Sequence, residues 1–135
     1  MKKSTIIALF ALIAVFATHA AQPMDFYARK AEEAIAEGRY RDALDYANQE
    51  ITDYEKNPNG YLQAAVSFYF LNEPGRALSM LDKAIAKSKK DKIMAGDCYH
   101  HKYWLLNGLG DTVQALKTLD QGLKADGKNV DLLLA

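Results

Sequence analysis

Only one cysteine, Cys98, occurs in the 135 residues of this chain. A disulfide needs two thiols, so none can form within the chain. Structural zinc sites require four ligands, and the sequence shows no paired clusters of cysteine and histidine at the usual spacing. The fold must therefore be held together by side-chain packing.

The motifs of common enzymes are also missing. The sequence contains no glycine-rich phosphate loop and no Gly-x-Ser-x-Gly nucleophile motif. Cys98 and His101 lie about one helical turn apart and could supply two metal ligands, but no second cluster completes the set. We expect no enzymatic activity, no cofactor and no metal site, with a metal or redox carrier using these two residues as the minor alternative.

The chain has no excess of charge of either sign. Two of its 17 basic residues, Lys2 and Lys3, lie in the first 20 positions, so residues 21–135 have 15 basic and 17 acidic residues and a formal charge of −2. Nucleic-acid-binding proteins usually carry a strong basic patch, so we expect no nucleic-acid partner. The one basic run, residues 87–92, is predicted to be a solvated, extended connection between helices; contact with lipid headgroups or an acidic partner is the alternative.

Long hydrophobic runs are absent as well. Residues 6–17 form an uncharged apolar stretch of 12 residues, whereas a membrane-spanning helix needs about 20. This stretch follows Lys2 and Lys3 and precedes a Thr-His-Ala sequence, which is typical of a signal peptide cleaved after Ala20. We expect residues 1–20 to be removed, leaving an exported protein in the periplasm or cell envelope without stable membrane insertion; an uncleaved anchor is the alternative.

Residues 21–135 contain a pattern that recurs three times. The second copy follows the first after 34 residues, and the third follows the second after 38. The copies are Tyr27, Ala31, Gly38, Ala43 and Leu44; Tyr61, Ala65, Asn72, Ala77 and Leu78; and Tyr99, Tyr103, Gly110, Ala115 and Leu116. Repeats of this length are supersecondary units that stack, because one unit cannot bury its apolar face alone.

Within each copy the apolar residues recur at spacings of three and four, which predicts helices. We expect six helices in three hairpins, the first helix of each hairpin covering about residues 24–37, 59–71 and 93–107. Gly38 and the Pro and Gly residues near 58–60, 74–75 and 108–110 separate them. The four extra residues of the third copy must lie between Ile85 and Tyr99.

These features resemble tetratricopeptide (TPR) repeats. Residues 38–44 and 110–116 carry the resemblance best, and Ala31, Ala65 and the alanines at 43, 77 and 115 match the small residues at which the two helices of a unit pack closely. The resemblance covers residues 24–129, with repeats at about 24–57, 58–91 and 96–129 in a domain of residues 21–135. It implies an all-α solenoid of three antiparallel helix hairpins that acts as a protein-interaction scaffold. Tyr103 stands where a small residue is usual, so we expect the third hairpin to be splayed or shifted.

The resemblance also implies a concave groove lined by the first helix of each repeat. Helix 59–71 supports this independently, because it is apolar on nearly all sides and has more apolar surface than one core contact needs. The predicted groove comprises Glu32, Ile35, Leu62, Val66, Tyr69, Phe70, His100, Trp104 and Asn107. The positions of the family's carboxylate clamp hold almost no positive charge (Ala28, Glu32, Gln63, Asp97 and His101), so we expect an apolar or aromatic peptide segment of another protein as the partner.

Two alternatives remain open. The apolar stripe of helix 59–71 could be core, covered by the N-terminal segment or by a second copy of the chain. The last predicted helix carries Val113, Leu116, Leu119 and Leu123, and residues 130–135 form only the beginning of another helix. Because solenoids normally end in a polar cap, the chain could be the N-terminal part of a longer repeat protein, or a homo-oligomer that covers this edge.

Overall fold

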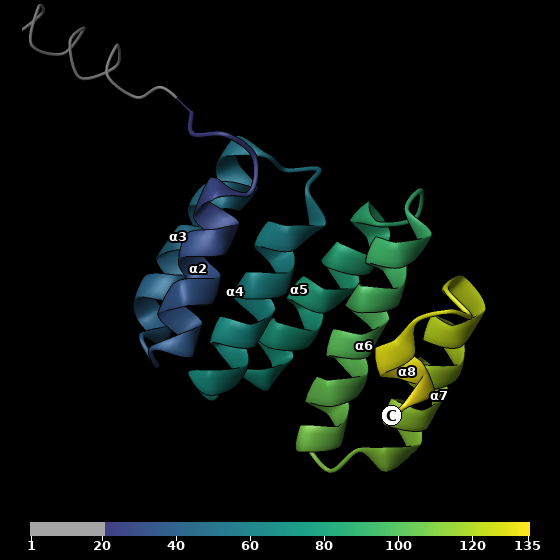
Figure 1. Cartoon of the computed structure of the whole chain (residues 1–135). Helices are drawn as coiled ribbons and strands as arrows, with labels where there is room; N and C mark the ends of the chain where they lie inside the picture. The colour runs from purple at the N-terminus through teal and green to yellow at the C-terminus, as the bar shows by residue number, and fades with distance from the viewer. Residues whose placement is uncertain (1–20) are drawn as a thin grey trace, which may run out of the picture.

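The computed structural model describes residues 21–135 and is all-helical over that range (Figure 1). The predicted signal peptide, residues 1–20, lies outside the described residues. Seven helices are present in the described part: α2 Phe26–Ala36, α3 Tyr40–Asp53, α4 Pro58–Phe70, α5 Pro74–Lys87, α6 Lys92–Gly108, α7 Thr112–Ala125 and α8 Val130–Leu133. The first six form the pairs α2/α3, α4/α5 and α6/α7, and each pair packs against the next along the chain. The predicted all-α fold with three helix pairs is confirmed.

The turn inside each pair is built in the same way three times. Gly38, Asn72 and Gly110 have φ values of 74°, 62° and 79°, a left-handed region that glycine and asparagine tolerate best. The next residue in each turn donates its backbone N–H to a carbonyl near the end of the preceding helix, as in Arg39 to Ala34 at 2.8 Å. This arrangement satisfies carbonyls that the helix end would leave unpaired. The 34- and 38-residue intervals of the sequence therefore mark equivalent turns.

Helix starts repeat in the same way. Asn57, Asp91 and Asn129 are the N-cap residues of α4, α6 and α8, and each side chain accepts a backbone N–H from the first turn. Side-chain caps of this kind typically stabilise a helix by about 1 kcal/mol. Proline at the first position of α4 and of α5 supports the same boundaries, because its missing N–H would have no partner there.

The four extra residues of the third copy lengthen a helix. The connection 88–91 between α5 and α6 has the same length as the connection 54–57 between α3 and α4, whereas α6 has 17 residues and α4 has 13. The prediction of an extended connection over residues 87–92 is therefore wrong. A local cause is the cap: Asp91 accepts the N–H groups of Ile93 and Met94, so helix α6 begins one turn earlier than the repeat pattern suggests.

Small residues allow the helices of each pair to approach closely. Ala31, Ala65, Ala43, Ala77 and Ala115 are all at most 1% exposed. In the third pair, Gly122 of α7 lies so near α6 that an added Cβ would be 2.8 Å from the Cβ of Tyr99. The α6/α7 pair is therefore closely packed, and the expected splaying of the third hairpin is not observed.

Candidate functional site

The predicted groove residues lie on three helices that follow one another in space. Helix α2 contacts α4, and α4 contacts α6. Glu32, Phe70, Trp104 and Asn107 are exposed; Ile35, Val66, Tyr69 and His100 are half-buried; Leu62 is buried. Leu62 contributes to the core instead of to an open surface, because only 4% of it is accessible.

Four aromatic side chains form a continuous surface that we call the aromatic strip: Tyr40, Tyr69, Phe70 and Trp104. The Tyr40 and Phe70 rings are stacked, with centroids 4.6 Å apart and planes 10° from parallel. The ring centroid of Trp104 lies 4.9 Å from that of Tyr69 and 6.0 Å from that of Phe70. The strip therefore connects the first turn of α3, the last turn of α4 and the second half of α6.

The strip remains accessible to a partner. Phe70 is 43% exposed and Trp104 is 40% exposed, although both rings touch other aromatic rings. Contacting aromatic side chains that stay partly exposed are common at binding sites, since they bring a large apolar area with few rotatable bonds. Three of the nine predicted groove residues, Tyr69, Phe70 and Trp104, are brought together here.

Tyr40 belongs to the aromatic strip, but it is not among the groove residues predicted from the sequence. Its spacing to Ala43, Leu44 and Ala47 places it on the apolar stripe of its own helix, which indicates core. The structure leaves it half-buried and stacked on Phe70, 30 residues away. The one sequence signal for this role is its position directly after the turn residues Gly38 and Arg39, where a helix begins at the edge of a hairpin.

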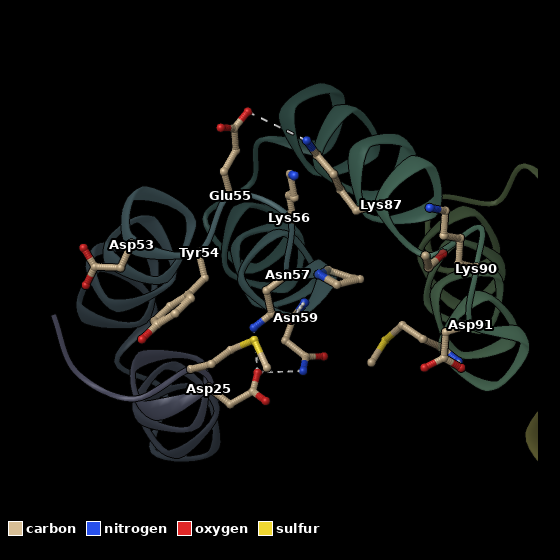
Figure 2. Close-up of a pocket in the computed structure, with 14 residues that line it drawn as sticks. Asp25, Asp53, Tyr54, Glu55, Lys56, Asn57, Asn59, Lys87, Lys90 and Asp91 are labelled. Atoms are coloured by element: carbon tan, nitrogen blue, oxygen red, sulfur yellow. Dashed lines mark hydrogen bonds and ion pairs between the residues drawn. The ribbon is translucent and has the colours of Figure 1, made fainter.

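A cavity that we call the end pocket lies at the opposite ends of α4 and α6 from the strip. Its volume is about 610 Å³, and its walls are the connections 54–57 and 88–91 with adjoining residues from the N-terminal segment and helices α3 to α6. Figure 2 shows Asp25, Asn57 and Asn59 on one wall and Lys90 and Asp91 on the other.

The charges around the end pocket are mixed. Lys87 pairs with Glu55 at 3.8 Å (Figure 2), and the Asp91 carboxylate caps α6. Lys56 and Lys90 carry no ion pair among the described residues, and Asp53 accepts a hydrogen bond from Gln49. The walls carry charges of both signs and are open to solvent, and they favour no ligand chemistry.

A buried polar network stands behind one wall of the end pocket. The Glu50 side chain is fully buried, and its Oε1 accepts the backbone N–H of Asp25 and the Nδ2 of Asn57, the latter at 3.0 Å. Asn57 and Asn59 also donate to Asp25 Oδ1 at 2.7 and 2.8 Å. The network holds the segment before α2 against α3 and α4; Tyr54 helps by donating its hydroxyl to the Gln22 carbonyl at 2.6 Å.

Cys98 and His101, the alternative pair of metal ligands, differ in burial. Cys98 is fully buried, and burial raises the pKa of its thiol to about 11. His101 is half-buried and its Nδ1 donates to the Asp97 carbonyl at 2.8 Å. Within residues 21–135, no three His, Cys, Asp or Glu side chains are grouped so that they could hold a metal ion.

Over residues 21–135, none of the helices combines the length and the apolar character needed to span a bilayer. No protein-family model matches the chain, and neither the curated proteins nor the solved structures include a match. The fold and the site define an all-α protein of adjacent helix pairs with an exposed aromatic strip.

Proposed function

We propose that this chain is a TPR-like α-solenoid module that binds an apolar or aromatic segment of another protein along its first helices. The observation that carries the proposal is the aromatic strip: two large aromatic side chains about two-fifths exposed, in contact with each other and with two more. Exposed apolar side chains that form a contiguous patch often mark a site of protein–protein interaction.

The internal repetition supports the solenoid assignment. The second helices α3, α5 and α7 each have 14 residues, and they begin 34 and then 38 residues apart. The first helices of the three pairs contact one another in chain order: α2 contacts α4, and α4 contacts α6. Stacked repeats require such contacts. A side-by-side row of first helices is the surface on which such a module would bind a peptide.

The proposed location is outside the cytoplasm, in the periplasm or cell envelope, with residues 1–20 removed. This part of the proposal rests on the charge and hydropathy of the N-terminus. Intact-mass measurement of the protein purified from the source cells tests it: a mass beginning at Ala21 is expected, and a mass that includes residues 1–20 would contradict cleavage.

Binding is tested by site-specific photocrosslinking in the source cells. A photoreactive amino acid at position 104 is expected to give one or a few discrete protein adducts, and the same probe at exposed Lys83 on α5 is the control. The Phe70→Ala change should then reduce the adducts at position 104. Adducts that are equal in pattern at both positions, or insensitive to Phe70→Ala, would contradict a binding role for the strip.

Trp104 also allows a simple check of accessibility. As the only tryptophan of the chain and 40% exposed, it should be quenched readily by acrylamide in the free protein. Full protection in a monomer would contradict the open groove.

A second candidate function is self-association, in which a second copy covers the apolar face of α7 and α8. Val113 is 77% exposed, Leu116 58% and Leu133 59%, whereas Leu132 of α8 is buried at 1%. Light scattering of the wild type and of a Val113→Lys, Leu116→Lys variant tests this: a dimer that the variant dissociates supports it, and a wild-type monomer excludes it. Further repeats covering the same face, as in a longer repeat protein, are the remaining form of this alternative.

A further inference from the structure

Three lysines and an isoleucine lie exposed at the point where α5 ends and α6 begins. We call residues 89–93 the basic tip; its members are Lys89, Lys90, Asp91, Lys92 and Ile93, and all five are exposed. The three lysines form no ion pair among residues 21–135. The Asp91 carboxylate accepts the backbone N–H groups of Ile93 and Met94, both at 3.1 Å. The tip therefore presents three ammonium groups that are free to meet an anion.

A hollow beside the tip joins this charge to apolar surface. Its volume is about 310 Å³, and its lining comes from α5, α6, α7 and the connection between the first two: Ile85, Lys89, Lys92, Ala95, Tyr99 and Ala125. Among the described residues, no carboxylate belongs to this lining. Two ammonium groups next to alkyl and aromatic side chains suit an anion that also carries an apolar body.

The wider surroundings of the hollow keep an excess of positive charge. The segments that form it, residues 83–99 and 120–128, contain seven lysines and four aspartates. A fifth carboxylate reaches them from another element, because Glu55 pairs with a lysine of α5 at 3.8 Å. Seven positive groups against five negative ones leave this surface positive. The carboxylates of Asp25 and Asp53 belong to the other wall of the end pocket, across from the tip (Figure 2).

The tip also lies at the end of the molecule where the described residues begin. The connection 54–57, the basic tip and residues 21–25 are at the same end of the helix pairs (Figure 1). The Tyr54 hydroxyl donates to the Gln22 carbonyl at 2.6 Å and holds the N-terminal segment there. The apolar stretch of residues 6–17, part of the predicted signal peptide, comes shortly before this segment in the sequence. A chain held to a membrane by that stretch during export would therefore bring the basic tip to the bilayer.

Ile93 gives the tip an apolar side chain beside its charges. It is 70% exposed, and Met24 at the same end is 56% exposed. Peripheral membrane proteins combine these two signals, because lysines are attracted to anionic headgroups while apolar side chains gain free energy on leaving water. An acidic segment of another protein would use the lysines alone. The combination of lysines, Ile93 and a part-apolar hollow therefore favours a lipid surface.

We propose that the basic tip docks the folded protein on an anionic phospholipid surface, with Ile93 among the headgroups and a lipid phosphate held by Lys89 and Lys92 at the hollow. The contact is peripheral, and no helix enters the bilayer. It is separate from the proposed function, because Trp104 lies 11 residues further along α6 than Ile93, which is roughly 17 Å. A protein docked in this way keeps its aromatic strip free for a partner.

Flotation with lipid vesicles tests the docking on protein purified from the source cells. One set of vesicles is phosphatidylcholine alone, and the other contains equal amounts of phosphatidylcholine and anionic phosphatidylglycerol. The tip variant carries three changes: Lys89→Gln, Lys90→Gln and Lys92→Gln. The charge-matched control removes three exposed basic groups from the first halves of α3, α5 and α7: Arg41→Gln, Arg76→Gln and Lys117→Gln. The N-terminus is the same in all three proteins, so a difference between them reports the tip.

We expect the wild type to bind the anionic vesicles at least about tenfold more strongly than the neutral ones, because each lysine near an anionic surface adds about fivefold. The tip variant should lose about tenfold or more of this binding, and the control less than about threefold. Ile93→Ser should lose about two- to fivefold on the same vesicles. High salt should abolish the preference for anionic vesicles, since it screens exposed charges. Circular dichroism checks that each variant is folded.

A photoreactive amino acid at position 93 separates the two kinds of anionic partner in the source cells. Crosslinks to phospholipid, which the tip variant should abolish, are expected. Protein adducts alone, if the tip variant abolishes them, assign the lysines to an acidic protein segment and overturn the membrane contact. Equal binding of the wild type to both kinds of vesicle, or equal losses in the tip variant and the control, also overturns it. None of these results changes the adducts expected at position 104, so the proposed function stands or fails separately.

Discussion

The phenol of Tyr69 lies directly against the backbone of Gly108, the last residue of α6. A Cβ placed on Gly108 would be 2.6 Å from the Tyr69 hydroxyl oxygen. Tyr69 can therefore take its place in the aromatic strip only because α6 ends in Gly108, which has no side chain to collide with the ring.

Replacing Gly108 with alanine should displace the Tyr69 ring and change the surroundings of Trp104, whose ring centroid is 4.9 Å away. We expect a shift in Trp104 emission and in the near-ultraviolet circular dichroism. Gly75→Ala is the matched control, since a Cβ there has open space and lies in helix α5. The control should leave Trp104 emission unchanged and raise stability by about 0.5–1 kcal/mol. Unchanged emission in Gly108→Ala would contradict the contact.

The core of the first two helix pairs depends on Leu81, which is 1% exposed and packs in the main buried cluster. Leu81→Ala removes buried methyl groups and leaves a cavity, so we expect the free energy of unfolding to fall by about 2–5 kcal/mol. Urea denaturation followed by circular dichroism measures it. Leu116→Ala removes the same atoms from a side chain that is 58% exposed, and a loss there as large as at Leu81 would indicate that α7 is covered in solution.

Asn57 is the link between the N-terminal segment and the core. Its Nδ2 donates hydrogen bonds to Asp25 Oδ1 and to Oε1 of the buried Glu50, and its Oδ1 caps α4. We expect Asn57→Ala to lower the free energy of unfolding by about 1–3 kcal/mol, because it leaves a buried carboxylate with one fewer donor and removes a cap. Asn48→Ala, at an exposed position of α3, should change it by less than about 0.5 kcal/mol. Equal changes in the free energy of unfolding of the two variants would mean that the polar network does not stabilise the fold.

Cys98 should behave as an inert core residue in the folded protein. Burial raises the pKa of its thiol from 9.0 to about 11, and a hydrogen bond with the Ser88 side chain opposes this only in part. Ellman's reagent at pH 8 should react slowly with the native protein and quickly in guanidinium chloride, because the thiolate is the reactive form. Fast reaction of the native protein would show that the helices around Cys98 open readily.

The same pKa makes stability depend on pH at the alkaline end. The folded state holds the thiol proton more tightly than the unfolded chain does, so this contribution is fully present below about pH 9. It is lost as the pH rises from about 9 to 11. Urea unfolding of the wild type and of Cys98→Ala across this range should show a steeper decline for the wild type. Parallel declines would contradict the raised pKa.

Features governed by local chemistry could be read from the sequence. The breaks at Gly38 and at the Pro and Gly residues near 58–60, 74–75 and 108–110 were predicted because glycine and proline disfavour helix continuation, and the structure has connections between helices there. The length of α6 was not, because a charged run such as residues 87–92 suits a solvated connection as well as a helix start capped by Asp91.

Features that need two distant segments were harder. The apolar pattern of helix 59–71 singled out Tyr69 and Phe70, and the family resemblance added Trp104, but Leu62 was placed with them and Tyr40 elsewhere. The period of a helix says which residues share a face and does not say how much of that face a neighbour covers. Glu50 shows the same limit: nothing in its own helix indicates that it is fully buried.

By itself the sequence determined that this protein is built from three helix pairs, and where most of the helices begin and end, because turns and caps are decided by residues next to each other in the chain. The tertiary structure alone decided that Tyr40 stacks on Phe70, that Leu62 is buried while Trp104 stays open, and that Lys89 and Lys92 line one hollow. Those relationships depend on how closely successive pairs pack, and that distance is set by contacts between side chains of different helices.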